Sequence, residues 1–339
     1  MTASSRMSTP TLSVVVPMFN EEDALPFFAA RLRPVLDALG CSYEVVCVDD
    51  GSRDRTAAVL RGISSMWSEL RLVRLRRNAG HQAALTAGLE AARGDWVVTI
   101  DADLQDPPEA IAAMLQTART TGVDVVYGRR SDRSADTLFK RGSAALYYRL
   151  IRRLVHVDLP EHAGDFRLLS RRAVNEIHAL PERRRVYRLL VPFMGFTSAG
   201  VDYVRDERVA GRSKYPLRRM LSLALDSFLS FTTAPLRAAI WLGALGFLAC
   251  SGFSVLALIS WLRGATLPGW TSVALVTGFV SAAQFLLLGV LGEYVARIYV
   301  ELQARPRYFL DVEDDPAEHG EATGVRAASP AVGSARDRA

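Results

Sequence analysis

Short apolar runs that alternate with helix-like segments constrain the fold of this chain more than any other feature. Five runs rich in valine, isoleucine and leucine are expected to form strands, at residues 11–16, 43–48, 72–75, 96–100 and 124–128. The segments between them have the composition and spacing of helices. Strands and helices that alternate at this spacing form a mostly parallel, doubly wound sheet. The sequence therefore predicts an α/β, Rossmann-like fold.

Two of the expected helices carry recognisable signals. Asn20, followed by three acids, is expected to cap and start a helix that runs to about Leu39. An alanine-rich helix is expected at 82–92, after the turn formed by residues 78–81.

Polar residues follow directly after these strands. Their positions are Asn20 and Glu21 after the first strand, Asp49 and Asp50 after the second, Asp101 and Asp103 after the fourth, and Arg129 and Arg130 after the fifth. Ligands of an open α/β sheet bind at the carboxyl ends of its strands. The chain contains neither a Gly-x-Gly-x-x-Gly motif nor a P-loop lysine motif, which counts against dinucleotide binding and ATP hydrolysis.

Asp101 and Asp103 are spaced so that both carboxylates reach a single cation, and oxygen ligands of this kind suit Mg²⁺ or Mn²⁺. A crevice that is lined by acids and lacks a glycine cradle must hold a diphosphate through a metal ion, and sugar nucleotides fit this arrangement. A solvated turn is the alternative for a bare Asp-x-Asp. Likewise, Glu21 is alternatively a helix-capping acid and Asp49 a turn former.

The distribution of apolar residues predicts a membrane protein. Among 339 residues, 50% are hydrophobic and 23% are charged, with a net charge of +5 and three cysteines, which fit a reducing cytoplasm. Two apolar runs, about 238–262 and 270–292, each exceed the roughly 20 residues that span a bilayer, although buried core helices are the alternative. Arginines precede the first run and follow the second, which predicts that both ends face the cytoplasm.

The sequence predicts five parts. They are a disordered N-terminus at 1–10, a globular domain at 11–215, a juxtamembrane amphipathic helix at 216–235, a two-helix transmembrane hairpin at 236–300, and a disordered tail at 311–339. An arginine-rich stretch at 131–160 with interleaved aromatic residues suits nucleic acid, but the helical spacing of its apolar residues favours a membrane surface.

Four motifs resemble those of a known family. They are Pro-Met-Phe-Asn-Glu at 17–21, Val-Asp-Asp-Gly-Ser at 48–52, Asn-Ala-Gly-His-Gln-Ala-Ala at 78–84 and Asp-Ala-Asp-Leu-Gln-Asp-Pro-Pro at 101–108. In this order they resemble family 2 glycosyltransferases with a GT-A fold. More narrowly, they resemble membrane-bound polyprenyl-phosphate sugar transferases related to dolichyl-phosphate mannose synthase and bactoprenol glucosyltransferase. The resemblance extends from about residue 11 to residue 305.

The resemblance implies a set of site residues. Base and ribose would be held by Pro17, Phe19, Glu21 and Asp49. Asp101, Ala102, Asp103 and Gln105 would surround the diphosphate and its metal ion, Mg²⁺ or Mn²⁺, and Arg129 would reach the phosphates. The acceptor phosphate and its lipid would be met by Arg129, Arg141, Ser143, Arg208 and Lys214.

Asp165, with Asp103, is the implied catalytic residue. A phosphate monoester acceptor is already largely dianionic, with a second pKa of about 6, so Asp165 either orients the acceptor or acts as a general base. The processive polysaccharide synthases carry a Gln-x-x-Arg-Trp motif, which Arg185-Val-Tyr-Arg188-Leu189 does not match. This difference argues against polymer synthesis.

The resemblance implies an inverting hexosyltransferase at the cytoplasmic face of the cell membrane. It would transfer a sugar from a nucleotide sugar, such as UDP-glucose, to undecaprenyl phosphate. A mannosyl or aminoarabinose-type transferase is the alternative on the same scaffold. A non-catalytic membrane scaffold, or a nucleic-acid-binding membrane protein, is the alternative of another class. The expected partners are the donor, the lipid and the bilayer, without nucleic acid, and family analogy implies a homo-oligomer, a tetramer.

Overall fold

The structure is a computed structural model. It describes residues 9–131, 163–182, 185–206, 269–303 and 305–311, together with scattered positions between 241 and 263. Several predictions therefore lie outside the described residues: most of the two disordered ends, the helix at 216–235, most of the first apolar run, and Arg141, Ser143, Arg208 and Lys214.

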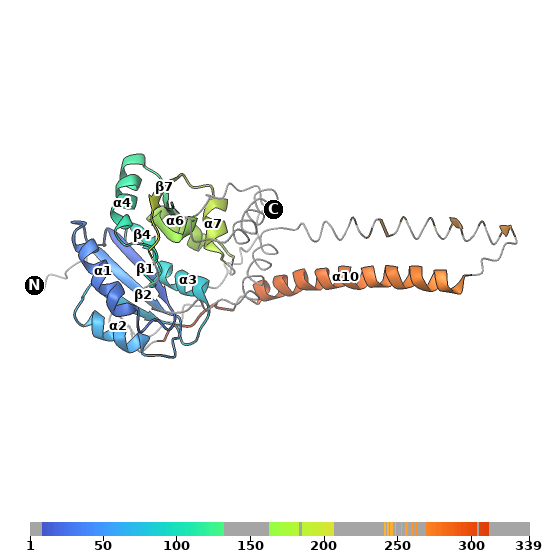
Figure 1. Cartoon of the computed structure of the whole chain (residues 1–339), viewed down its shortest axis with the longest axis horizontal. Coiled ribbons are helices and arrows are strands. Elements are labelled where there is room, and N and C mark those ends of the chain that lie inside the picture. Colours follow the sequence, from blue (N-terminus) through green and yellow to red (C-terminus); the bar gives the residue numbers. More distant parts are fainter. Residues whose placement is uncertain are drawn as a thin grey trace, which may run out of the picture.

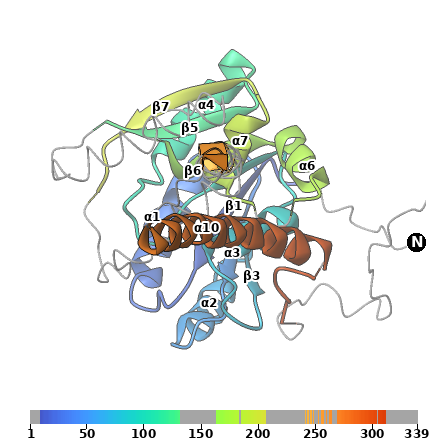
Figure 2. The ribbon, with the colours of Figure 1, turned by 90° about the vertical axis from the view of Figure 1, so that its right-hand side faces the viewer.

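A seven-stranded sheet forms the centre of the molecule (Figure 1). The strands are β1 Leu12–Met18, β2 Tyr43–Asp49, β3 Leu70–Arg74, β4 Trp96–Thr99, β5 Val125–Arg130, β6 Ala163–Ser170 and β7 Ser198–Tyr203. Their order in the sheet is β3-β2-β1-β4-β6-β5-β7, so β3 and β7 are the two edges (Figure 2). All neighbours are parallel except β6, which runs antiparallel to β4 and β5.

The mostly parallel sheet confirms the fold class predicted from the sequence. The five predicted strands correspond to β1–β5. Residues 201–209 alternate weakly, which predicts an edge strand, and β7 overlaps the beginning of this range. The sequence did not predict β6 as a strand. Polar and apolar residues alternate only from Asp165 to Leu168, and Leu169 ends the alternation, so the pattern is too short to identify a strand by itself.

Helices cover both faces of the sheet, as expected of a doubly wound fold. Their bounds are α1 Leu25–Asp37, α2 Thr56–Ser64, α3 His81–Ala91, α4 Ala110–Thr121, α6 Arg171–Ala179, α7 Tyr187–Phe193 and α10 Trp270–Leu302. The first hydrophobic cluster packs α1, α2 and α4 against one face, and the second packs α3, α6 and α7 against the other.

The predicted start of the first helix is wrong by about one turn. Asn20 does not cap α1, which begins at Leu25; Asn20 has a φ of 54°, and its Oδ1 accepts a hydrogen bond from the amide of Arg53. Asparagine tolerates this left-handed conformation better than most residues. Asn20 therefore links the loop after β1 to the loop after β2.

Helix α3 packs closely against the sheet at Gly88. A Cβ atom placed at Gly88 would lie 2.3 Å from Val15 Cγ1 and 3.0 Å from Val48 Cγ2. We expect Gly88→Ala to lower the free energy of unfolding by about 1–3 kcal/mol through overpacking. This loss outweighs the gain of up to about 1 kcal/mol in helix propensity. Thermal unfolding followed by circular dichroism in detergent measures the change.

Gly62 in α2 is the matched control, because no atom would lie within 4 Å of a Cβ there. Gly62→Ala should raise the melting temperature slightly through helix propensity. Equal shifts in the two variants would contradict the close packing of α3 on β1 and β2.

Helix α10 spans 33 residues and extends away from the sheet (Figure 1). Within the described part of the chain, no helix combines the length and the apolar character needed to cross a membrane. The transmembrane hairpin therefore stays a prediction.

Candidate active site

The antiparallel strand β6 brings Asp165 beside the end of β4. Thr99, the last residue of β4, pairs with Arg167 of β6, and its hydroxyl donates a hydrogen bond to the carbonyl of Asp165. Asp101 follows β4 by two residues. Two carboxylates that are 64 positions apart in sequence consequently meet at the carboxyl edge of the parallel strands, where ligands of such sheets bind.

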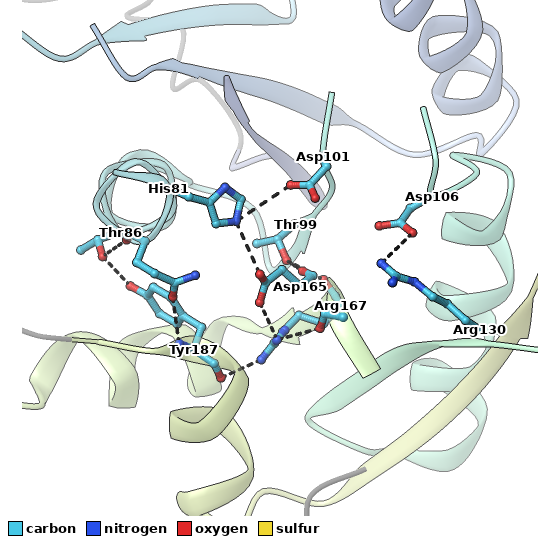
Figure 3. Close-up of polar contacts among 11 residues, drawn as sticks. His81, Thr86, Thr99, Asp101, Asp106, Arg130, Asp165, Arg167 and Tyr187 are labelled. Carbon is cyan, nitrogen blue, oxygen red and sulfur yellow. Dashed lines mark hydrogen bonds and ion pairs between the residues drawn. The ribbon is translucent and has the colours of Figure 1, made fainter. Parts of the chain in front are cut away.

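His81 lies between these two carboxylates (Figure 3). Its Nε2 is 3.5 Å from Asp165 Oδ2 and 4.0 Å from Asp101 Oδ1. Burial opposes protonation of the imidazole, but the hydrogen bond with Asp165 and the charge of Asp101 raise the pKa of His81 above its ordinary value. The sequence noted His81 only within a motif, and the structure makes it the bridge of the site.

Arg167 holds Asp165 from the other side. Its Nη2 lies 3.1 Å from Asp165 Oδ1, and the guanidinium also donates to the carbonyls of Gly164 and Tyr187, each at 2.8 Å. Arg167 is 2% exposed, so this cation acts at short range in a region of low dielectric. Its charge is fully paired, which makes it part of the framework of the site.

The charge of Asp165 is fixed by these neighbours. Burial alone would raise its pKa, but the hydrogen bond with His81 and the charges of Arg167 and Arg188 hold the pKa of Asp165 well below its usual range. Arg188 belongs to α7 and is exposed. Asp165 is therefore a carboxylate throughout the physiological pH range, and so weak a base is poorly suited to remove a proton.

A second network ties α3 to α7 beneath the site. The Gln82 side-chain oxygen accepts a hydrogen bond from the Tyr187 amide at 3.0 Å, and the Tyr187 hydroxyl lies 2.9 Å from Thr86 Oγ1. Because the Tyr187 carbonyl also accepts from Arg167, the network fixes the support of Asp165 on two elements.

Asp101 and Asp103 supply oxygen donors beside this group. Burial raises the pKa of Asp101 to about 6, and although His81 opposes this shift, neighbouring carboxylates add to it. Asp103 Oδ1 accepts a hydrogen bond from the Gln105 amide at 3.1 Å, which shapes the turn. A divalent cation would relieve the excess of negative charge, so the donor set fits such an ion.

No group of three or more potential ligands for a metal ion occurs among the described histidine, cysteine and acidic residues. Two carboxylates suffice where phosphate oxygens and water complete the shell, as is usual for Mg²⁺.

The arginines at the end of β5 point to different partners. Arg129 Nε lies 3.0 Å from Asp202 Oδ1 across the β5–β7 pair. Arg130 Nη2 lies 3.6 Å from Asp106 Oδ1, and the Tyr203 hydroxyl donates to the same oxygen (Figure 3 shows the ion pair). Alternation along the strand separates the two side chains. Arg130, which the sequence noted without a role, is thus nearer the acidic motif than the predicted Arg129.

The loops after β1 and β2 carry the remaining predicted residues. Pro17 is buried in β1, Phe19 is half-buried, and the Glu21 amide donates to Thr56 Oγ1 at 2.9 Å. Asp49 is fully buried at the end of β2, where its Oδ1 accepts from the Ser52 amide at 2.9 Å. Asp49 thus fixes the turn after β2.

Gln105 and Ala102 complete the predicted set. Ala102 is buried at 3% exposure. The Gln105 side-chain oxygen accepts a hydrogen bond from Arg205, and its carbonyl accepts one from the Asp206 amide at 3.0 Å. Arg205 adds a cation, which the sequence did not single out, at the rim of the acidic loop.

The contact between His81 and Asp165 predicts a pH-dependent contribution to stability. Because the folded-state pKa of His81 is raised, its protonation stabilises the protein fully below about pH 6.5, and the contribution disappears as the pH rises through that pKa. We expect the difference in melting temperature between wild type and His81→Gln to shrink between about pH 6 and about pH 9. Thermal unfolding in the presence of EDTA measures it, and a difference independent of pH would contradict the contact.

The structure is a GT-A-like domain with clustered acids at the carboxyl edge of its parallel strands. A solved structure with a similar fold is that of glucosyl-3-phosphoglycerate synthase from Mycobacterium tuberculosis, crystallised with Mn²⁺, uridine diphosphate and glucosyl-3-phosphoglycerate. It matches with a TM-score of 0.50 and 24% identity over 66% of this chain and 80% of that chain. This likeness supports the fold.

Sequence comparison identifies the family. The model of glycosyl transferase family 2 matches residues 13–178. The uncharacterized glycosyltransferase YkcC of Bacillus subtilis (strain 168) is 40% identical over 301 residues, covering 88% of this chain and 92% of the relative. The bactoprenol glucosyl transferase of Shigella phage SfII is 37% identical over 302 residues, covering 88% and 97%. The chain belongs to glycosyl transferase family 2 and is a glycosyltransferase.

Proposed function

We propose that this glycosyltransferase moves a hexose from a nucleotide sugar to a polyprenyl phosphate at the cytoplasmic face of the cell membrane. UDP-glucose and undecaprenyl phosphate are the proposed substrates. The match to the bactoprenol glucosyl transferase of Shigella phage SfII covers 97% of that relative, and its name supports a polyprenyl phosphate as the acceptor. Membership of a glycosyltransferase family counts against the non-catalytic scaffold and the nucleic-acid-binding protein.

One observation carries the proposal. Asp101, beside the proposed metal, and Asp165, beside the proposed acceptor, contact the same histidine, His81. A donor diphosphate and an acceptor phosphate held at these two carboxylates would lie next to each other, which is the proximity that transfer between them needs.

Asp101 and Asp103 would hold Mg²⁺ or Mn²⁺, and such an ion supplies charge stabilisation for the departing nucleoside diphosphate. The base and ribose of the donor would be bound by Pro17, Phe19, Glu21 and Asp49. Arg129 is proposed to reach the phosphates through a change of its partner, because its present contact is Asp202.

The proposed reaction is a single displacement with inversion. An acceptor phosphate oxygen forms the new bond to the anomeric carbon while the bond from that carbon to the donor phosphate oxygen breaks. The nucleoside diphosphate leaves with the electron pair, so one negative charge passes from the acceptor to the leaving group and no proton must move. Asp165, with its depressed pKa, therefore fits an orienting role better than that of a general base.

The membrane part of the proposal rests on the sequence. The amphipathic helix at 216–235 and a hairpin of residues 236–300 would hold the domain 11–215 at the bilayer, where the acceptor resides. Arg141, Ser143, Arg208 and Lys214 would meet the lipid phosphate. Anchoring suits the acceptor, because each exposed methylene of a long polyprenyl tail costs about 0.8 kcal/mol.

A transfer assay in detergent micelles tests the proposal. It would combine the full chain, undecaprenyl phosphate, labelled UDP- and GDP-sugars, and Mg²⁺ or Mn²⁺. Lipid-linked product from one donor, lost with EDTA, is the expected result and names the sugar. Lipid-linked product from a mannosyl or aminoarabinose donor, instead of a glucosyl donor, would support transfer to polyprenyl phosphate but contradict UDP-glucose as the donor. A folded, metal-loaded protein that yields no lipid product would overturn the acceptor assignment.

A further inference from the structure

The segment that follows α10 returns to the globular part and lies along edge strand β3. Leu310 pairs with Leu75 as an antiparallel bridge. The Asp311 amide donates to the Arg74 carbonyl at 2.8 Å, and the Arg76 amide donates to the Phe309 carbonyl at 2.9 Å. In Figure 1 this is the red segment beyond the end of α10. We call residues 308–311 the C-terminal strap.

Side chains reinforce this docking. Arg76 Nε donates to the Leu310 carbonyl at 2.9 Å, and the Tyr308 hydroxyl donates to Glu90 of α3. Tyr308 also packs against the second hydrophobic cluster. The strap is thus held by backbone, polar and apolar contacts together.

Arg74 connects the strap to the candidate nucleotide site. Its Nη1 lies 3.6 Å from Asp311 Oδ2, and its Nε lies 3.4 Å from Asp49 Oδ2. Asp49 is fully buried, and in the described part of the chain its Oδ2 has no hydrogen-bond partner. A buried carboxylate depends strongly on a nearby counter-charge, so Arg74 is the group that makes this burial tolerable.

From Asp49 the contacts continue into the crevice. Asp49 Oδ1 accepts from the Ser52 amide, and Ser52 Oγ accepts from the Asn20 amide, each at 2.9 Å. The Asp49 carbonyl accepts from the Leu75 amide at 2.9 Å. A continuous series of contacts therefore connects the strap to the loops after β1 and β2, which would enclose base and ribose.

The loop after β3 also contacts the loop after β2. Asp50 accepts hydrogen bonds from the amides of Ala79 and Gly80, at 2.7 and 2.9 Å. Gly51 has a φ of 63°, and a Cβ there would lie 2.5 Å from the backbone of Arg77. This close contact leaves the loop after β2 little freedom to move independently of residues 75–80, to which the strap binds.

We propose that Arg74 and Asp311 are positioning residues for the nucleotide-sugar site, through which the strap after α10 contributes to nucleotide affinity. The inference rests on the proposed function, because it takes Asp49 and the adjoining loops as the nucleotide end of the crevice. Arg74 acts by holding Asp49, and Asp311 acts by orienting Arg74.

The expected loss of nucleotide affinity is larger for substitutions of Arg74, which contacts Asp49, than for substitutions of Asp311, which contacts Arg74. Arg74 and Asp311 are each about one-third exposed, so their ion pair is partly screened, and Asp311→Asn should weaken nucleotide binding about threefold to fivefold. Arg74→Ala should weaken it more, about tenfold or beyond, because Asp49 then stays buried without a counter-charge. Arg74→Lys keeps the charge without the planar fork and should fall between wild type and Arg74→Ala.

Isothermal titration of the full chain in detergent micelles tests the inference. Uridine, guanosine and thymidine diphosphates with Mn²⁺ are compared on the wild type, and the tightest binder is the probe for the variants. Tyr308→Phe is the matched control, because it removes a strap contact and leaves the Arg74 ion pairs intact. Melting temperatures are recorded for each variant.

The inference expects weaker binding in Asp311→Asn, wild-type binding in Tyr308→Phe, and an Asp311 effect that shrinks at high salt. Equal effects of Asp311→Asn and Tyr308→Phe on binding would overturn it in favour of a purely structural strap. Unchanged binding in Asp311→Asn and Arg74→Lys, together with weakened binding in Asp49→Asn, would overturn it while keeping the nucleotide site. Wild-type binding in Asp49→Asn, or no binding to wild type, would instead contradict the proposed function and this inference with it.

Discussion

Asp101→Asn is expected to lower kcat/KM for sugar transfer by about a hundredfold to a thousandfold, as is typical when a group that stabilises a charged transition state is lost. Asparagine preserves the size of the side chain but removes the negative charge that would hold the cation. Chelation of the metal from wild-type protein should reduce activity at least as far. Formation of lipid-linked sugar, measured over a range of Mg²⁺ or Mn²⁺ concentrations, checks both expectations, and excess metal should restore part of the variant's activity.

Asp37→Asn is the matched control for Asp101→Asn. Asp37 ends α1 and accepts a hydrogen bond from Tyr43, which begins β2, so it lies at the opposite end of that strand from Asp49. The Asp37→Asn variant should keep wild-type transfer activity. If Asp101→Asn retained near wild-type activity and metal dependence, Asp101 would have no place in the proposed metal site.

Asp165→Asn is expected to lower kcat by about a hundredfold while leaving the pH dependence of kcat unchanged. The physical reason is the depressed pKa of Asp165, which keeps it ionised across the working range, so that its loss removes orientation and charge. An acidic limb near about pH 6 fits the acceptor phosphate, and also Asp101, whose pKa burial raises to about 6, so such a limb should persist in the variant.

The pH profile separates the two roles that the sequence left open for Asp165. Profiles of kcat between about pH 5 and about pH 9 for wild type and variant provide the measurement. An acidic limb present in wild type and absent from Asp165→Asn would mean that Asp165 titrates during turnover and acts as a base. Arg167→Lys offers a second test, because lysine cannot reproduce the three contacts of the buried guanidinium and should also lower kcat.

Local properties explain why much of the fold was predictable. Strands β1 to β5 are short apolar runs that end in polar or turn-forming residues, and both signals lie within a few positions of each other. The cap of α6 is an equally local signal, because a serine directly before a helical segment is a favoured cap, and Ser170 Oγ accepts a hydrogen bond from the Ala173 amide at 3.1 Å. The helix start at Asn20 failed because a residue 33 positions away competes for its side chain.

Some residues of the candidate site were likewise predictable from local sequence, whereas their contacts with one another were not. Acids at strand ends identify Asp101, Asp103 and Asp49 from the sequence, and resemblance to a family adds Asp165. The contacts of His81 with Asp101 and Asp165 are not visible in the sequence, since they join the start of α3, the loop after β4 and strand β6. The available signal was a histidine at the end of the turn 78–81, between the predicted strand 72–75 and the predicted helix 82–92.

By itself the sequence determined the alternating strands and helices, the mostly parallel sheet, the acidic strand ends and the family, because each depends on the order of nearby residues. Only the tertiary structure decided that β6 enters the sheet antiparallel between β4 and β5, that His81 bridges two carboxylates, and that the strap reaches Asp49 through Arg74. The physical reason is that strand register, ion pairs and counter-charges for buried groups arise between segments far apart in the chain. Their free energy depends on distances that only the folded packing sets.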